Sequence, residues 1–307
     1  MHHIPVLLNE TIQGLNVRSS GTYVDATLGR AGHSSALLKL LKDGGHLYCF
    51  DQDAQAIKES EEILKKISSS FTLIHDNFEN LEARLLSYGV SRVDGVMFDL
   101  GVSSAQFDDG DRGFSYRFNA RLDMRMNKDT SLTAETVVNT YDFASLAKIL
   151  SEYGEERYAK QIAKNIVLRR MTKRISTTFE LVDIIKSSLP KKELTKVGHP
   201  AKKTFQAIRI EVNNELGVLE KGIRQACSML NSKGRVAVIT FHSLEDRIVK
   251  RIFKELSDEG EGSRYFLSES KIASFELINR KPILPSVNEI EQNNRSHSAK
   301  LRIIERR

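Results

Sequence analysis

The sequence predicts an α/β fold in which a doubly wound sheet is interrupted by an all-helical insertion. Short apolar segments with strand character alternate with amphipathic helical segments as far as Asp99. From Thr133 to about Arg209 the strand signals disappear, and alternation resumes at Gly234–Phe241. We therefore expect one discontinuous α/β domain, 1–107 and 210–307, around an inserted helical domain, 108–209.

The first predicted elements surround a glycine-containing turn. The apolar run Val24–Thr27 ends at a loop with Gly29 and Gly32, and a second strand, His46–Phe50, ends at Asp51. Glycines let the backbone approach a ligand closely, and a carboxylate about 20 residues further on can accept hydrogen bonds from both ribose hydroxyls. The segment predicts a site for an adenosine-containing cofactor. NAD, FAD and S-adenosylmethionine (SAM) all present such a ribose, and the full dinucleotide fingerprint is missing.

The remaining elements continue the alternation and then close the sheet. Helices are expected after His33, at Asp53–Lys65 and at Leu81–Tyr88, and strands at Phe71–His75 and Val93–Phe98. A long amphipathic helix, about Lys203–Leu230, leads out of the insertion, and Ser243 with Asp246 marks another helix start. The segments FELINR and KLRIIER have strand character and would close the sheet.

Composition limits the classes of protein to which the chain can belong. At 307 residues with 40% hydrophobic residues, it can form a full α/β domain and an insertion. No apolar run approaches the roughly 18 residues of a membrane helix, and the segment MHHIPVLLNETIQGL lacks the features of a signal peptide. Cys49 and Cys227 have no metal-ligand or redox spacing, so we expect both in the core. A soluble, cytoplasmic protein without metal ligands is predicted.

Positive charge is concentrated in the helical insertion. Between Arg157 and Arg209, 14 Lys and Arg face three acidic residues, so this segment carries +11 whereas the whole chain carries +6. Two clusters contribute most: Arg169, Arg170, Lys173 and Arg174, and Lys191, Lys192, Lys196, Lys202 and Lys203. A solvated helix face normally mixes both signs, so this excess predicts contact with nucleic-acid phosphates. The alternative is a basic surface without a partner.

Asp99 ends the fourth predicted strand and precedes the loop Leu100–Ser104. In α/β sheets the catalytic groups lie at the carboxyl ends of the strands. An adenosine site beside a basic insertion indicates a transferase that acts on RNA or DNA, and methyl transfer fits best.

Longer motifs then resemble those of one known family. They are GRAGH, FDQD, HDNF, FDLGVSS, RGFSYR, LDMRM, YGEERYAKQIA, HPAKKTFQAIRIEVNNEL and FHSLEDRIVK, and they run almost from end to end. In these motifs the chain resembles the bacterial RsmH family, also called MraW. The resemblance implies a class I SAM-dependent methyltransferase with a Rossmann-like sheet. It also implies methylation of N4 of one cytidine in the decoding region of 16S rRNA, within the small ribosomal subunit or a late assembly intermediate.

The motif match also implies a set of cofactor-binding residues. Ala31, Gly32 and His33 would line the methionine side of SAM, Asp51 would bind the ribose, Phe78 would lie at the adenine, and Asp99 with Gln106 would complete the pocket. The family usually has glycine where this chain has Ala31. Because alanine disfavours positive φ, we expect ordinary backbone angles at Ala31 and a contact through its N–H.

Several of these residues have a plainer interpretation. Asp51 could cap the following helix, Phe78 could be a core residue, and His33 is expected to use its backbone rather than its ring. His242 and Ser243 follow the fifth strand, where Ser243 either caps a helix or contacts substrate. Three arginines beyond Asp99 either meet RNA phosphates or pair with nearby aspartates: Arg112, Arg121 and Arg125.

The target atom constrains the chemistry. Methylation at carbon 5 of a pyrimidine needs a cysteine nucleophile, and neither Cys49 nor Cys227 lies near the Asp99 loop in sequence. An exocyclic amine instead needs acceptors that hold its N–H bonds, so Asp99 is the candidate catalytic residue that orients the amine or accepts its proton. The competing hypotheses are a ribose 2′-O-methyltransferase, which would need a lysine near Asp99, and a non-catalytic RNA-binding module.

Overall fold

The chain forms two compact units in the computed structural model, which describes residues 5–101, 110–258 and 273–307. The first unit comprises Met1–Gly101 with Leu216–Arg307, and the second is Val102–Glu215. The sequence had suggested that the α/β part resumes at residue 210. Residues 210–215 belong instead to the second unit, because helix α11 (Lys202–Asn213) continues to Asn213 and buries Val212 in the core of that unit.

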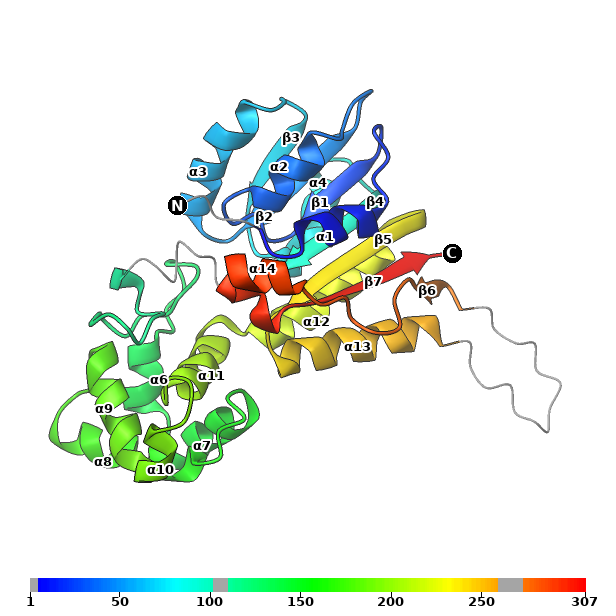
Figure 1. Cartoon of the computed structure of the whole chain (residues 1–307). Helices are drawn as coiled ribbons and strands as arrows, with labels where there is room; N and C mark the ends of the chain where they lie inside the picture. Colours follow the sequence, from blue (N-terminus) through cyan, green and yellow to red (C-terminus); the bar gives the residue numbers. More distant parts are fainter. Residues whose placement is uncertain (1–4, 102–109, 259–272) are drawn as a thin grey trace, which may run out of the picture. The chain divides into compact units, whose positions relative to one another are not determined.

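A seven-stranded sheet in the order β3-β2-β1-β4-β5-β7-β6 forms the centre of the first unit (Figure 1). The strands are β1 (Thr22–Asp25), β2 (His46–Asp51), β3 (Phe71–His75), β4 (Val93–Asp99), β5 (Leu230–Thr240), β6 (Phe275–Leu277) and β7 (Lys300–Arg306). The first five are parallel, whereas β7 runs antiparallel to both β5 and β6. The reversal of strand order between β1 and β4 confirms the predicted doubly wound α/β fold.

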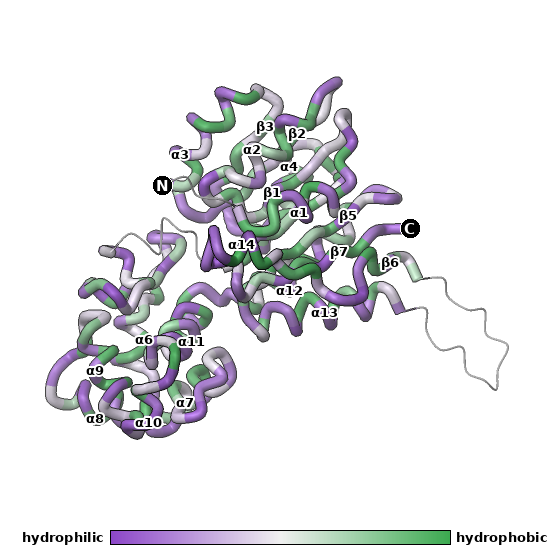
Figure 2. The backbone as a smooth tube through the Cα atoms, in the orientation of Figure 1, coloured by the Kyte–Doolittle hydropathy of each residue, from purple (hydrophilic) through white to green (hydrophobic). Residues whose placement is uncertain are grey.

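Helices cover both faces of this sheet, since alternate strand residues point to opposite sides. On one face, α4 (Leu81–Ser87), α12 (Glu215–Ser228) and α13 (Ser243–Ser257) pack on side chains such as Phe98 and Val238. On the other, α1 (Leu8–Leu15), α2 (Gly32–Leu38) and α3 (Ala54–Lys65) pack on their strand neighbours, including Met97 and Ile239. Figure 2 shows hydrophobic residues gathered along the strands of the sheet. Because both faces are buried, the sequences of these strands are continuous apolar runs rather than alternating ones.

The second unit is built from helices around its own core. They are α6 (Ala134–Thr140), α7 (Phe143–Glu152), α8 (Ala159–Thr172), α9 (Thr178–Ser188), α10 (Lys191–Leu194) and α11. Thr177 and Glu180 form a capping box at the start of α9, and Asp142 caps α7, which are local reasons for helices to begin there. The only strand-like pairing within the described part of this unit is the bridge between Arg121 and Thr177. Among the helices that the structure describes in either unit, none has the length and apolar character needed to cross a membrane.

The single long helix expected over Lys203–Leu230 is wrong. The chain forms two helices, α11 and α12, because Asn214 between them adopts a left-handed conformation with φ 47°. Asparagine tolerates this region better than most residues. The side chain of Asn213 stabilises the end of α11, since its amide donates to the carbonyls of Met124 and Arg209.

Candidate functional site

Three carboxylates meet at the carboxyl edge of the parallel sheet. Asp25, Asp51 and Asp99 are the last residues of β1, β2 and β4, and these strands are adjacent. The register places Asp25 opposite Cys49 and Met97, so each of the other two aspartates lies two residues further toward the same edge. A row of carboxylates at this edge is suited to a cationic ligand.

Asp25 is the residue of this row that the sequence interpretation missed. Its side chain is 1% exposed, and its two oxygens accept hydrogen bonds from Ser34 Oγ (2.6 Å) and from the Thr27 N–H (3.0 Å). Burial raises the pKa of Asp25 above its ordinary value, and the two donors oppose that shift. Its position at the end of the first strand was the available signal. The hydrogen bond to Thr27 also explains why β1 ends at Asp25 rather than at Thr27.

Asp51 organises the turn that follows β1. One carboxylate oxygen accepts from the Gly29 N–H at 2.9 Å, and the other accepts from the Asp53 N–H at 2.8 Å. Burial raises the pKa of Asp51 to about 6, against the opposing effect of these two donors. The alternative that Asp51 caps the next helix is wrong, because Asp53 is the N-cap of α3 and accepts from the Gln55 N–H.

The turn between Gly29 and Gly32 differs from the expectation at Ala31. Ala31 has φ 56° and lies in the left-handed region, so the predicted ordinary angles are wrong. Its N–H donates to the Leu28 carbonyl at 2.8 Å, so the turn itself uses the group that was expected to contact a ligand. Gly32 needs to be glycine for a steric reason, since a Cβ there would lie 2.4 Å from Pro5 Cγ.

Asp99 has one engaged and one unengaged carboxylate oxygen. Oδ2 lies 3.5 Å from His33 Nδ1, whereas Oδ1 is buried and accepts no hydrogen bond from any described residue. The Asp99 N–H donates to Thr27 Oγ1, which holds the end of β4 against the turn. Burial raises the pKa of Asp99 to about 8, and the charges of Asp25 and Glu245 contribute to the rise. A buried acceptor without a donor is typical of a ligand-binding position.

The raised pKa of Asp99 predicts a stability effect. The folded protein favours the neutral acid, so this contribution to stability is complete below pH 3.8 and is lost as the pH rises toward 8. The asparagine side chain of the Asp99→Asn variant carries no charge at any of these pH values. We expect the variant to exceed the wild type in unfolding free energy by about 2 to 4 kcal/mol at pH 8, and by much less at pH 5.

Urea unfolding of both proteins at the two pH values measures this difference. A difference that does not change between pH 5 and pH 8 would show that Asp99 ionises normally in the folded protein.

Phe78 lies at the carboxyl side of β3 but also packs into the core. It begins a short 3-10 helix, Phe78–Asn80, and its ring meets the Phe98 ring edge-on at 5.4 Å. A Cβ on Gly222 of α12 would lie 2.6 Å from the Phe78 ring, so this glycine leaves room for it. The ring is nevertheless only partly buried. Gln106 and the loop residues 102–104 lie outside the described residues.

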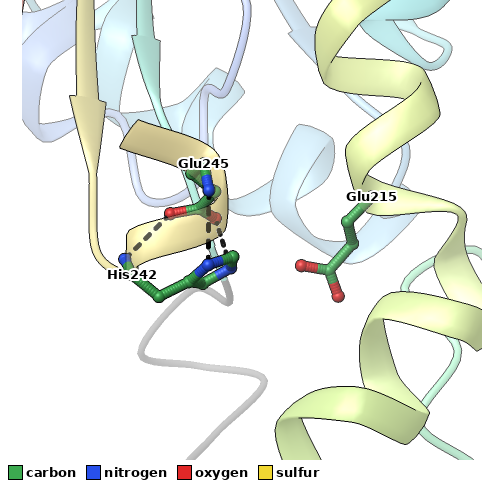
Figure 3. Close-up of side chains that lie close together, drawn as sticks. All are labelled: Glu215, His242 and Glu245. Carbon is green, nitrogen blue, oxygen red and sulfur yellow. Dashed lines mark hydrogen bonds and ion pairs between the residues drawn. The ribbon is translucent and has the colours of Figure 1, made fainter. Parts of the chain in front are cut away.

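His242 and Glu245 form a helix start, as Figure 3 shows. The Glu245 N–H donates to His242 Nδ1, and Glu245 Oε2 accepts from the N–H groups of Phe241 and His242. The expected cap at Ser243 is therefore wrong: His242 is the N-cap, and Ser243 is the first helical residue. Glu215, also labelled in the figure, accepts two hydrogen bonds from the Arg209 guanidinium.

The three arginines beyond Asp99 have structural partners. Arg125 pairs with Asp123 at 2.8 Å, and Arg121 pairs with Glu135 at 3.0 Å. Arg112 is buried and donates to the carbonyls of Arg125 and Met126. Of these arginines Arg125 pairs with an aspartate, whereas the Arg121 side chain is 78% exposed, so contact between Arg121 and RNA phosphates stays a prediction.

The first of the two predicted basic clusters is largely engaged within its own unit. Arg170 donates to two carbonyls, those of Val138 and Tyr141, and helps to close the helical core. Lys173 pairs with Glu180, and Arg174 pairs with Glu135. Lys173 and Arg174 nevertheless keep side chains that are 67% and 62% exposed, so the phosphate contact expected of this cluster stays a prediction. Exposed cations of this unit that make no ion pair within the described ranges include Lys160, Lys164, Arg169, Lys186, Lys191, Lys192 and Lys202.

Comparison with known proteins extends these observations over the whole chain. The chain matches the model of the MraW methylase family over residues 1–307. It is 54% identical over 306 residues to a ribosomal RNA small subunit methyltransferase H of Streptococcus equi subsp. equi, covering 98% of this chain and 96% of the relative. A protein of the same name from Streptococcus mutans is 53% identical over 309 residues, covering 99% and 98%. Among solved structures, a putative rRNA-methylase from Clostridium thermocellum aligns with 99% of this chain and 100% of its own, at 14% identity and a TM-score of 0.47.

Proposed function

The chain belongs to the MraW methylase family, and we propose that this SAM-dependent methyltransferase modifies N4 of one cytidine in the decoding region of 16S rRNA. The two Streptococcus relatives are named as methyltransferases of small-subunit rRNA, which supports an rRNA substrate. The observation that carries the choice of an amine is Asp99 Oδ1, a buried acceptor that lacks a donor within the described residues.

The carboxylates at the sheet edge fit the cofactor by charge. SAM carries a sulfonium and an ammonium group, and Asp25, Asp51 and Asp99 lie together at this edge. When bound, SAM supplies an electrophilic methyl group. We assign Asp51 to the ribose hydroxyls and Phe78 to the adenine, with Gly32, His33, Asp99 and Gln106 completing the site. Ala31 would contribute its tight turn rather than its N–H.

In the proposed mechanism Asp99 accepts a hydrogen bond from the target amine. The lone pair of an exocyclic amine is delocalised into the ring, and an acceptor that holds an N–H bond helps to localise it. A carboxylate can also take the proton that the nitrogen loses after the transfer. Both roles need an oxygen that is not already paired, and Oδ1 meets that condition within the described part of the chain.

The two cysteines argue against covalent chemistry at carbon 5. Cys49 and Cys227 are 0% and 1% exposed, and both thiols are free. Burial raises the pKa of Cys227 to about 12 and that of Cys49 well above its ordinary value, so neither forms a thiolate readily near neutral pH. Ribose methylation is also less well supported, because the ion-pair partner of Asp99 in the described residues is His33 rather than a lysine.

The decisive experiment is nucleoside analysis of 16S rRNA from cells that lack this protein. Mass spectrometry should show one N4-methylcytidine replaced by a cytidine lacking that methyl group, and the wild-type gene should restore it. Loss of a 2′-O-methyl or 5-methyl mark instead would refute the proposed target atom.

The exposed lysines of the helical unit are expected to contact RNA phosphates. Changing Lys160, Lys164, Lys191 and Lys192 to Ala should weaken RNA binding and reduce the slope of log affinity against log salt by about 0.7 to 0.9 for each lost contact. SAM affinity should not change. Salt titration of RNA binding by the wild type and the variant measures the slope.

A matched control removes the same charge from the other unit. Lys39, Lys42, Lys58 and Lys66 are exposed residues of the sheet unit, and their change to Ala should leave the slope unaltered. Equal slopes for both quadruple variants and the wild type would mean that another surface binds the RNA.

A further inference from the structure

The His33 ring is held between the N-terminal segment and the end of β4. His33 is the second residue of α2 and its side chain is 5% exposed. Nε2 lies 3.0 Å from the Val6 carbonyl oxygen, and Nδ1 lies 3.5 Å from Asp99 Oδ2. The ring therefore connects a backbone acceptor on one side to a carboxylate on the other.

The Val6 carbonyl determines which ring nitrogen carries a hydrogen. A carbonyl oxygen can only accept, so Nε2 must be protonated to make this contact favourable. In the neutral ring Nδ1 then bears a lone pair that faces Asp99. An ionised Asp99 would oppose that lone pair with its own negative charge. One proton placed between Nδ1 and Oδ2 removes the repulsion, whether it is counted on the acid or on the imidazole.

The surrounding charges favour retention of that proton. Asp25 on β1 and Glu245 on α13 both act on Asp99 and disfavour a further negative charge. Asp25 is partly compensated by its donors Ser34 and Thr27, and Glu245 by the N–H groups that it caps and by His242, which lies 3.1 Å from Glu245 Oε1. The His33 ring is the group that directly faces Asp99 Oδ2.

We propose that His33 is a positioning residue that shares one proton with Asp99 and thereby holds the carboxylate with Oδ2 engaged and Oδ1 left to accept from the ligand. This inference rests on the proposed role of Asp99 in amine methylation. Its first consequence, the shared proton, is a property of the ligand-free protein. The second, an effect on methyl transfer, depends on the reaction.

Nitrogen NMR of the histidine side chains tests the shared proton without any substrate. In the ligand-free wild type, the Nδ1 signal of His33 should change as the pH rises through the raised pKa of Asp99, which is about 8. Asp99→Asn should abolish that step. A matched control is His46→Gln, which alters a histidine at the opposite edge of the same sheet and should leave the His33 signal unchanged. A His33 signal that is the same in the wild type and in the Asp99→Asn variant at every pH would overturn the proposal.

Kinetics of two His33 variants test the positioning role. His33→Asn keeps a short polar side chain beside Asp99, and His33→Gln is the longer amide that can reach toward Val6. Both should lower the single-turnover rate at saturating SAM by roughly tenfold and shift its pH profile, with at most a small change in RNA KM. A proportionate fall at all pH values would indicate a merely structural role and refute positioning. If the product proves not to be N4-methylcytidine, the proposed function fails while the NMR result still decides the shared proton.

Discussion

Asp99→Asn is expected to lower the single-turnover rate of methyl transfer by about 10²- to 10⁴-fold at saturating SAM, while SAM affinity changes far less. Asparagine keeps the shape and one acceptor oxygen, but it cannot take up a proton near neutral pH. The buried Oδ1 of Asp99 is the atom whose loss of basicity this substitution tests. Rapid mixing of the enzyme–SAM complex with RNA, followed by product quantification, measures the rate.

The corresponding control is Asp43→Asn, the same chemical change in an exposed turn of the same unit. Asp43 has φ 53°, a conformation that asparagine accepts, so the fold should not be disturbed. Its rate should equal that of the wild type. If the rate of Asp99→Asn falls only as far as reduced SAM occupancy predicts, Asp99 is a cofactor ligand, and the backbone must hold the amine.

Asp51→Ala is expected to weaken SAM binding by about 1.5 to 3 kcal/mol, or roughly 10- to 100-fold in Kd. The substitution removes the carboxylate assigned to the ribose. It also removes the acceptor for the Gly29 and Asp53 N–H groups, so the turn loses its anchor at the same time. Isothermal titration calorimetry of SAM with the purified protein measures the loss.

A neighbouring aspartate provides the control for this loss. Asp53→Ala removes the N-cap of α3 and should lower the free energy of unfolding by about 1 kcal/mol without changing SAM affinity.

The affinity of the wild type for SAM should also depend on pH. Burial raises the pKa of Asp51 to about 6, so wild-type affinity should decrease as the pH falls from 7 to 5, whereas Asp51→Ala should show little of this dependence. Equal affinity of Asp51→Ala and the wild type would exclude Asp51 from the site.

Local patterns predicted some elements well and others poorly, for identifiable reasons. The strand Phe71–His75 was predicted with the bounds that it has, because its apolar residues are bounded by polar ones on both sides. The helix over Lys203–Leu230 was predicted without a break, because amphipathic periodicity continues across Asn214. A left-handed residue that preserves the helical periodicity leaves little trace in the sequence.

The residues of the candidate site were likewise predicted in part. Asp51 and Asp99 could be found because each ends a predicted strand. The sequence could not indicate that Ala31 adopts a positive φ, since alanine normally avoids it and the surrounding packing over-determines it here. Nor could it indicate that Arg170 and Arg174 are engaged internally, because their partners, the Val138 and Tyr141 carbonyls and Glu135, are about 30 residues or more away in sequence.

The sequence by itself determined the class of fold, the alternation of strands and helices before the insertion, the family resemblance, and Asp51 and Asp99 at their strand ends. These follow from periodicity and from residue types at fixed positions along the chain. Only the tertiary structure decided that Asp25 joins the same edge, that Val6 and Asp99 share the His33 ring, and which cations remain unpaired in the helical unit's described part. Such contacts join residues far apart in sequence, and whether a charge or a lone pair is satisfied depends on the atoms that folding brings beside it.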